Sequence, residues 1–209
     1  MNPLRRTLLA PALAASALLL VQIPQDPPSA PSGIKAGGKA GVEAAATAPS
    51  AMEDGASLAT LMNALYAAVS GAAGQPRDFA RLERIGHRLG RIVTFVPAKD
   101  GPRVVAQPIT EFVRRSAAAP IAEGFLETPV VERIEEWGDM AQIWSSYAVR
   151  HAAEDAEPFA RGINVVTAVR EGGRWQVLQV LFRGEGEGLE LPAQYRTPDP
   201  ERGREDARR

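Results

Sequence analysis

The sequence predicts an α+β domain in which three helices, with one strand among them, precede four long antiparallel strands. The stretch 159–182 alternates apolar and polar residues on both sides of Glu171-Gly172-Gly173-Arg174. This pattern is typical of a β-hairpin, because glycine supplies the positive φ of a tight turn. Upstream of residue 118, apolar residues recur at helical spacing instead. A hairpin cannot bury its faces alone, so we expect the helices to cover one side of a curved sheet.

The composition places the ordered mass in the middle of the chain. Of 209 residues, 45% are hydrophobic and 23% charged, and the aromatic residues lie between Tyr66 and Tyr195. The net charge is −1 and no long stretch is strongly basic, so we expect no nucleic-acid partner. The absence of cysteine from the sequence excludes disulfides and thiolate catalysis.

The two ends of the chain differ from its middle. Arg5 and Arg6 precede an uncharged, mostly apolar segment at 7–23, which is typical of a secretory signal peptide. The cleavage site is poorly defined, so an uncleaved N-terminal anchor stays open, and so does the export route. We therefore expect an exported protein, periplasmic or secreted, that meets a membrane only through an uncleaved leader. The predicted division is a leader at 1–23, a disordered linker at 24–56, a domain at 57–195 and a disordered tail at 196–209.

Start signals define the three helices. Ser57 and Asp78 are suitable N-caps, and Pro108 is suited to a first helical turn. We expect helices at 58–70, 79–89 and 108–118, a strand at 91–97 and a turn at 98–105.

From Phe125 the apolar pattern changes to period two, which predicts a strand pair. If Gly138-Asp139 forms the turn, Glu132 lies opposite Ser145, and Tyr147 follows on the same face. The apolar residues expected on that face are Val130, Ile134, Ala141, Ile143 and Val149. The opposite face is expected to carry Arg133, Glu135, Trp137, Gln142, Trp144 and Ser146.

Three segments carry a resemblance to a known family. LMNALYAAVSGAAGQPRDFARL, ERIEEWGDMAQIWSSYAVRH and EPFARGINVVTAVREGGRWQVLQVLF resemble the nuclear transport factor 2-like superfamily, in particular its bacterial SnoaL-like members of unknown function. The likeness covers residues 57–195. It implies a cone-shaped α+β fold, in which a curved antiparallel sheet and three N-terminal helices enclose a pocket and dimers form through the outer sheet face. None of the superfamily's catalytic motifs is recognisable, and Ile85-Gly86-His87 stands where relatives tend to place an aromatic residue.

The strand-pair register suggests one catalytic constellation. If the Glu132 face is the inner one, a carboxylate lies beside the hydroxyls of Ser145 and Tyr147 in an apolar cavity. Desolvation would raise the pKa of Glu132, so that Glu132 with Tyr147 could act as a general acid or base. Alternatively, Glu132 lies solvated at the cone mouth while the two hydroxyls bond to backbone. A slip of one residue would exchange the faces.

Three further residues are candidate ligand contacts. Arg161 could bind a carboxylate and Asn164 could orient a carbonyl, since both enter the central hairpin from a loop. The alternative for Arg161 is an ion pair with Glu154 or Glu157. Tyr66 fits the core face of the first helix, and its hydroxyl could reach the cavity.

Neither a metal nor another cofactor is predicted. His87 and His151 are the only histidines of the sequence, and neither has a second ligand at suitable spacing. Trp137 and Trp144 share a sheet face with polar residues, which favours a homodimer through that face.

These observations favour an exported protein that binds a small apolar molecule or serves as a non-catalytic dimeric scaffold. One alternative is an acid–base enzyme of the isomerase or dehydratase type that uses a pocket carboxylate. The other is a protein-interaction module of the cell envelope that presents the Trp137 and Trp144 face to a different partner.

Overall fold

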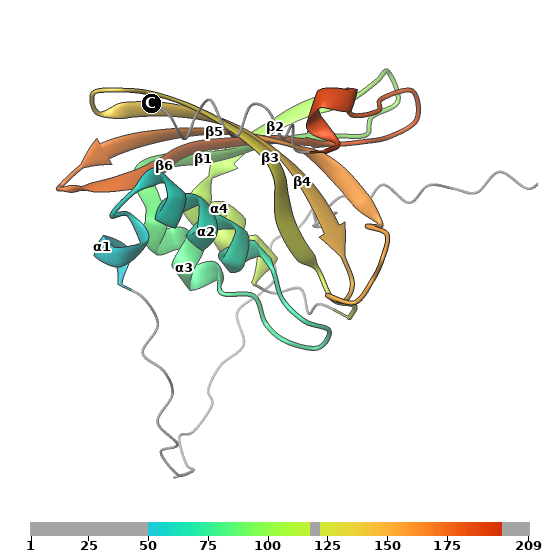
Figure 1. Ribbon diagram of the computed structural model, residues 1–209, viewed down its shortest axis with the longest axis horizontal. Coiled ribbons are helices and arrows are strands. Elements are labelled where there is room, and N and C mark those ends of the chain that lie inside the picture. Colours follow the sequence, from blue (N-terminus) through green and yellow to red (C-terminus); the bar gives the residue numbers. More distant parts are fainter. Residues whose placement is uncertain (1–49, 118–121, 198–209) are drawn as a thin grey trace, which may run out of the picture.

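A six-stranded curved sheet with helices on one side forms the domain (Figure 1). The computed structural model describes residues 50–117 and 122–197. Its helical elements are α1 (Ala51–Asp54), α2 (Leu58–Val69), α3 (Phe79–Ile85), α4 (Ile109–Ser116) and the short 3-10 helix η1 (Ala193–Tyr195). Its strands are β1 (Gly86–Val96), β2 (Arg103–Pro108), β3 (Leu126–Trp137), β4 (Met140–Arg150), β5 (Ala160–Glu171) and β6 (Arg174–Gly184).

The strand order is β2-β1-β6-β5-β4-β3, and only the β1–β6 pair is parallel. Strands β3 and β4 curl toward the side on which the helices lie, whereas η1 lies on the opposite side of the sheet (Figure 1). The α+β fold class predicted from the sequence, a curved sheet covered by helices in the shape of a cone, is confirmed.

Both predicted hairpins are present, with their turns at the predicted residues. Gly172 and Gly173 adopt φ values of 64° and 81° between β5 and β6, a left-handed conformation that favours glycine. Gly138, at φ 59°, turns the chain from β3 into β4. Glu132 pairs with Ser145 across these two strands, as the position of the turn predicted.

The segment after α3 differs from its prediction. The expected helix at 79–89 ends at Ile85, because Gly86 already pairs with Val177 and begins β1. Leu89, which was expected on the buried helix face, is 59% exposed. The expected turn at 98–105 is shorter, since Arg103 opens β2, an additional strand that pairs with β1. Sheet pairing has overridden a local helical pattern in this region.

The core lies between the helices and the inner face of the sheet. Helices α2 and α3 contribute Leu61, Leu82 and Ile85, which are fully buried. The sheet contributes side chains from three adjacent strands, among them Ile143, Val166 and Val177. No helix within residues 50–117 and 122–197 is long and apolar enough to cross a membrane. The predicted leader, and residues 24–49 of the predicted linker, lie outside the described residues.

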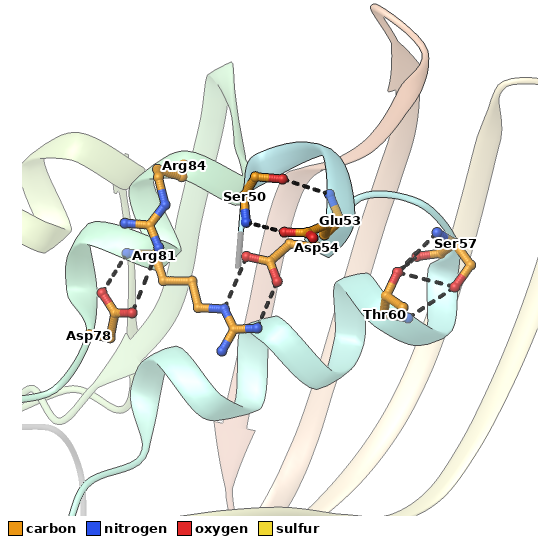
Figure 2. A network of polar contacts seen from close by, with 8 residues as sticks. All are labelled: Ser50, Glu53, Asp54, Ser57, Thr60, Asp78, Arg81 and Arg84. Carbon is orange, nitrogen blue, oxygen red and sulfur yellow. Dashed lines mark hydrogen bonds and ion pairs between the residues drawn. The ribbon is translucent and has the colours of Figure 1, made fainter. Parts of the chain in front are cut away.

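The N-terminal edge of the domain starts earlier than predicted. Residues 50–56, expected in the linker, include α1, and Asp54 is only 3% exposed. Its carboxylate accepts two hydrogen bonds from the guanidinium of Arg81, at 3.0 and 2.6 Å (Figure 2). The next residue, Gly55, accepts a backbone hydrogen bond from Trp175 at 2.8 Å. The sequence did not predict that residues 50–56 belong to the domain, because α1 has few large apolar side chains and is held to α3 by a polar contact.

Replacement of Asp54 by Asn should destabilise the domain by about 2 kcal/mol, since the half-buried guanidinium of Arg81 loses its counter-charge. Urea unfolding followed by circular dichroism measures the change. The matched control is Glu111→Gln, which breaks a similar two-bonded pair with Arg114 on the exposed face of α4 and should change the stability little. Equal losses in the two variants would contradict a structural role for α1.

Candidate functional site

A chain of side-chain hydrogen bonds crosses the inner side of the sheet. Asn164 on β5 donates to the hydroxyl of Tyr66 on α2 at 3.4 Å. The Tyr66 hydroxyl lies 2.5 Å from Ser145 Oγ on β4, and Ser145 donates to Glu132 on β3 at 3.1 Å. Followed from Asn164 to Glu132, each donor in this chain meets an acceptor, so the buried hydroxyls of Tyr66 and Ser145 both have hydrogen-bond partners. Three of the predicted ligand contacts, Tyr66, Ser145 and Asn164, are thus brought together.

A β-bulge in β3 decides which acidic residues face inward. Pro129 pairs with Tyr147 and Val131 pairs with Ser146, so that Val130 is an extra residue without a partner. Glu127, opposite Val149, therefore lies on the same face as Glu132, although a regular strand would place residues five apart on opposite faces. The prediction that Val130 belongs to the regular inner face is wrong for this reason.

Glu127 is the carboxylate that lines the inner cavity. Its Oε1 accepts a hydrogen bond from Asn164 Nδ2 at 2.9 Å. Burial raises the pKa of Glu127 to about 7, and the Asn164 hydrogen bond and the positive charge of Arg77 lower it only in part. The side chain of Glu127 is half-buried, and it lines the cavity.

The cavity has a volume of about 70 Å³ and is mostly apolar. Its polar lining consists of Glu127, Tyr147 and Asn164. The other lining residues come from helices and strands alike: Leu65, Val69, Leu82, Ile92, Phe112, Phe125, Val149, Val180 and Phe182. An engineered apolar cavity of roughly 150 Å³ accepts benzene, so this one suits a molecule smaller than a benzene ring.

Tyr147 reaches the cavity because its cross-strand neighbour is a glycine. Gly162 pairs with Tyr147 across β4 and β5, and a Cβ atom at that position would collide with the tyrosine hydroxyl. Within residues 50–117 and 122–197 no side chain makes a hydrogen bond with this hydroxyl. Burial, followed by the nearby charge of Glu127, raises the pKa of Tyr147, so the phenol stays protonated at neutral pH and can donate to a ligand.

The predicted pair of Glu132 and Tyr147 is not brought together at the cavity. Tyr147 lines it, but Glu132 is an exposed residue of the edge strand β3, bonded to Ser145 and absent from the cavity wall. Desolvation raises the pKa of Glu132 as predicted, and the Ser145 hydrogen bond opposes that rise. The carboxylate expected in the pocket is present, but it is Glu127.

Arg161 does not contact the cavity either. Its guanidinium lies 3.3 Å from the carboxylate of Glu157, which is the alternative foreseen for it, and the side chain is partly exposed. Asn164, three residues later, does line the cavity.

Sequence reasoning missed Glu127 because it assumed an unbroken alternation along β3. One signal was available: Pro129 lies within the strand, and proline is confined there to edges and bulges. A bulge at this proline would have reversed the faces upstream of it and turned Glu127 inward.

The histidines have structural partners. His87 Nε2 lies 2.9 Å from the carboxylate of Glu171, and His151 Nδ1 lies 2.9 Å from the carbonyl oxygen of Gly124. No group of three His, Cys, Asp or Glu residues in the described ranges is arranged to hold a metal ion.

The architecture is that of an α+β cone: a curved, unclosed sheet with helices on its concave side and a small cavity between them.

No protein-family model and no curated protein matches the chain. Similar solved structures include an NTF-2-like protein of unknown function from Silicibacter pomeroyi DSS-3, with 18% identity, 61% of this chain and 92% of that chain covered, and a TM-score of 0.43.

Two further structures are similar to a comparable degree. One is a proposed ketosteroid isomerase from Shewanella frigidimarina NCIMB 400, with 17% identity, 51% and 81% of the two chains covered, and a TM-score of 0.37. The other is an NTF2-like protein of unknown function from Pseudomonas putida KT2440, with 11% identity, 55% and 80% covered, and a TM-score of 0.42. Two of these three structures are described as NTF2-like proteins, and the likeness concerns the fold alone.

The raised pKa of Glu127 predicts a pH-dependent stability. Between pH 4.5 and about 7 the folded protein keeps a proton that the unfolded chain has released, so the free energy of unfolding falls as pH rises, by on the order of 3 kcal/mol from this group. Glu127→Gln cannot ionise, so its stability curve should be flatter in this window and lie above that of the wild type beyond pH 7. Urea unfolding across pH 4–8 measures both curves.

The control for this experiment is Glu157→Gln, which changes an exposed carboxylate and should keep the wild-type slope. Parallel curves for wild type and Glu127→Gln would show that the carboxyl of Glu127 is solvated.

Proposed function

We propose that this domain binds a small, largely apolar molecule inside the cone and holds one polar atom of that molecule at Glu127. One observation carries the proposal: a carboxyl, a tyrosine hydroxyl and the amide of Asn164 face an otherwise apolar cavity. Burial of polar groups without a structural need costs free energy, whereas a few convergent polar groups in an apolar pocket are typical of ligand sites.

The cavity supports a particular ligand chemistry. Its volume of about 70 Å³ favours a short-chain compound over a polycyclic one. With a pKa of about 7, Glu127 is partly protonated at neutral pH, so it can accept a hydrogen bond from a hydroxyl or donate one to a carbonyl. The Tyr147 hydroxyl supplies a second donor. A short-chain ketone or alcohol fits this arrangement.

The second candidate function is acid–base catalysis, and the pKa of Glu127 favours it. A general base is most effective when its pKa lies near the working pH, and a buried carboxyl at about 7 meets this condition. The protonated Tyr147 could stabilise negative charge that develops on a carbonyl oxygen. The reaction class would be proton abstraction from the carbon next to a carbonyl, as in an isomerase.

We expect 2-butanone and 2-butanol to bind to the wild-type protein in saturation-transfer NMR. Val180→Phe should abolish both signals by filling the cavity. Glu127→Gln should weaken binding of the alcohol about fivefold to tenfold, since a hydrogen bond to a charged acceptor becomes one to a neutral amide. The matched control is Glu132→Gln, on the same strand but outside the cavity. Equal binding to the wild type and Val180→Phe would refute the site.

The same compounds separate the two functions. If Glu127 acts as a base, hydrogens next to the carbonyl of 2-butanone should exchange with deuterium in D2O, and Glu127→Gln should lose this exchange. Binding without exchange supports a binding protein.

The outer face supports a further proposal, that the exported domain forms a homodimer. Trp137 is 78% exposed, and its cross-strand partner Met140 is also exposed, at the end of the β3–β4 hairpin. Trp144, by contrast, packs partly against Tyr195 of its own chain. Because exposed apolar clusters of this kind favour association, Trp137→Arg should convert a dimer into a monomer in analytical ultracentrifugation. An unchanged mass would leave this face to a different protein or to solvent.

A further inference from the structure

A second cavity lies on the outer side of the sheet, away from the helices. Its volume is about 220 Å³, some three times that of the inner cavity. The wall is formed on one side by outward-facing strand residues and on the other by the chain that follows β6, residues 185–192. Its apolar lining includes Phe95, Trp144, Val165, Leu181, Leu189 and Leu191. We call this cavity the outer groove and residues 185–197 the strap.

Hydrogen bonds within the strap fix its conformation and contacts of Tyr195 hold it to the sheet, so the outer groove is part of the folded domain. Glu185 accepts a hydrogen bond from the backbone N–H of Leu191 at 2.7 Å, and Arg196 donates to the carbonyl oxygen of Leu191 at 2.8 Å. Farther along, the ring of Tyr195 packs against Trp144 with 5.8 Å between the ring centroids. Arg133 stacks on that tyrosine and donates to its hydroxyl at 3.1 Å. Figure 1 shows η1 of the strap over the sheet face opposite the helices.

Three charged residues line the outer groove, and two of them are already engaged. Glu185 bonds to the strap backbone, and Glu190 pairs with Arg196 at 2.8 Å. The third, Arg183, lies over the ring of Phe95 at 4.6 Å, and no ion pair joins it to any residue in the described ranges. The outer groove therefore combines a nearly continuous apolar wall with one cation that lacks a counter-charge within that part of the chain.

We propose that the outer groove binds a medium-chain carboxylate, with the acyl chain along the apolar wall and the carboxylate at Arg183. A cavity of roughly 150 Å³ accepts the six carbons of benzene, so 220 Å³ accommodates about eight to ten non-hydrogen atoms. The guanidinium of Arg183 has the planar fork that matches a carboxylate. The inner cavity lies on the other side of the sheet, where Val180 lines it, whereas Val165 and Leu181 face the outer groove; Phe182 borders both cavities.

Isothermal titration of the full-length protein with octanoate tests the proposal. Octanoate should bind at least tenfold more tightly than 1-octanol or octylammonium, which share its chain but lack its negative charge. Arg183→Gln should weaken octanoate binding about fivefold to tenfold, and Arg183→Lys should restore part of it. The matched control is Arg170→Gln, because Arg170 stacks in the same way on Trp175 but lies far from the outer groove. Equal affinities for octanoate and octanol, or no effect of Arg183→Gln, would overturn the proposal.

Two variants locate the site. Val165→Trp should fill the outer groove and abolish octanoate binding, whereas Val180→Phe, in the inner cavity, should leave it unchanged. If Val165→Trp does not fold, Leu189→Glu on the exposed part of the strap places a like charge at the groove and should weaken binding instead. Loss of binding in Val180→Phe alone would assign octanoate to the inner cavity. If the protein is a dimer that does not bind octanoate and does not dissociate in its presence, the outer groove is assigned to a second copy of the chain. Both this result and loss of binding in Val180→Phe alone would refute the proposal.

Discussion

The extra residue at Val130 is the constraint on which the candidate site depends. By breaking the alternation of β3, the bulge turns Glu127 toward the helices while Glu132 still faces Ser145. The bulge interrupts the backbone hydrogen bonds between β3 and β4. The fully buried side chain of Ser146 partly replaces them, because it accepts a hydrogen bond from the N–H of Val131 at 3.1 Å. In a regular strand Glu127 would point away from the cavity, whose wall would then carry no carboxylate.

Asn164 connects the two inward-facing carboxylates. It divides its two amide hydrogens between Glu127 and Tyr66, and the Tyr66–Ser145 contact continues to Glu132. A buried polar group without a partner costs roughly 1–3 kcal/mol, so this network stabilises the inner side of the sheet as well as orienting its side chains. The residues thus have two roles: Tyr66 and Ser145 complete the network, while Glu127 and Tyr147 present atoms to the cavity.

The two faces of the sheet offer different environments. Along β5 and β6, alternate residues face either the helices or the strap, so that Val166 and Val180 belong to the core while Val165 and Leu181 line the outer groove. The inner cavity is small and contains a desolvated carboxyl. The outer groove is larger, more apolar and has an arginine at its edge. Such a sheet, with helices on one face and its own C-terminal strap on the other, presents two cavities of different chemistry.

Much of the fold was determined by local sequence patterns. The cap at Ser57, the glycine pair 172–173 and the turn at Gly138 each act over a few neighbouring residues, and the structure has α2 and both hairpins where these signals predicted them. The pairing of Glu132 with Ser145 followed from the turn position alone, because hairpin register depends on the turn. Tyr147, two residues beyond Ser145 on the same face, lines the cavity as this register predicted.

Only the tertiary structure decided the rest. Gly86 starts a strand because it pairs with Val177 of β6, some ninety residues later in the sequence. The position of α1 depends on the contact between Asp54 and Arg81. The identity of the cavity carboxylate depends on a single unpaired residue in β3, and the outer groove on the return of the strap over the sheet. These features arise from contacts between segments distant in sequence, whereas periodicity and turn chemistry describe only the interactions of near neighbours.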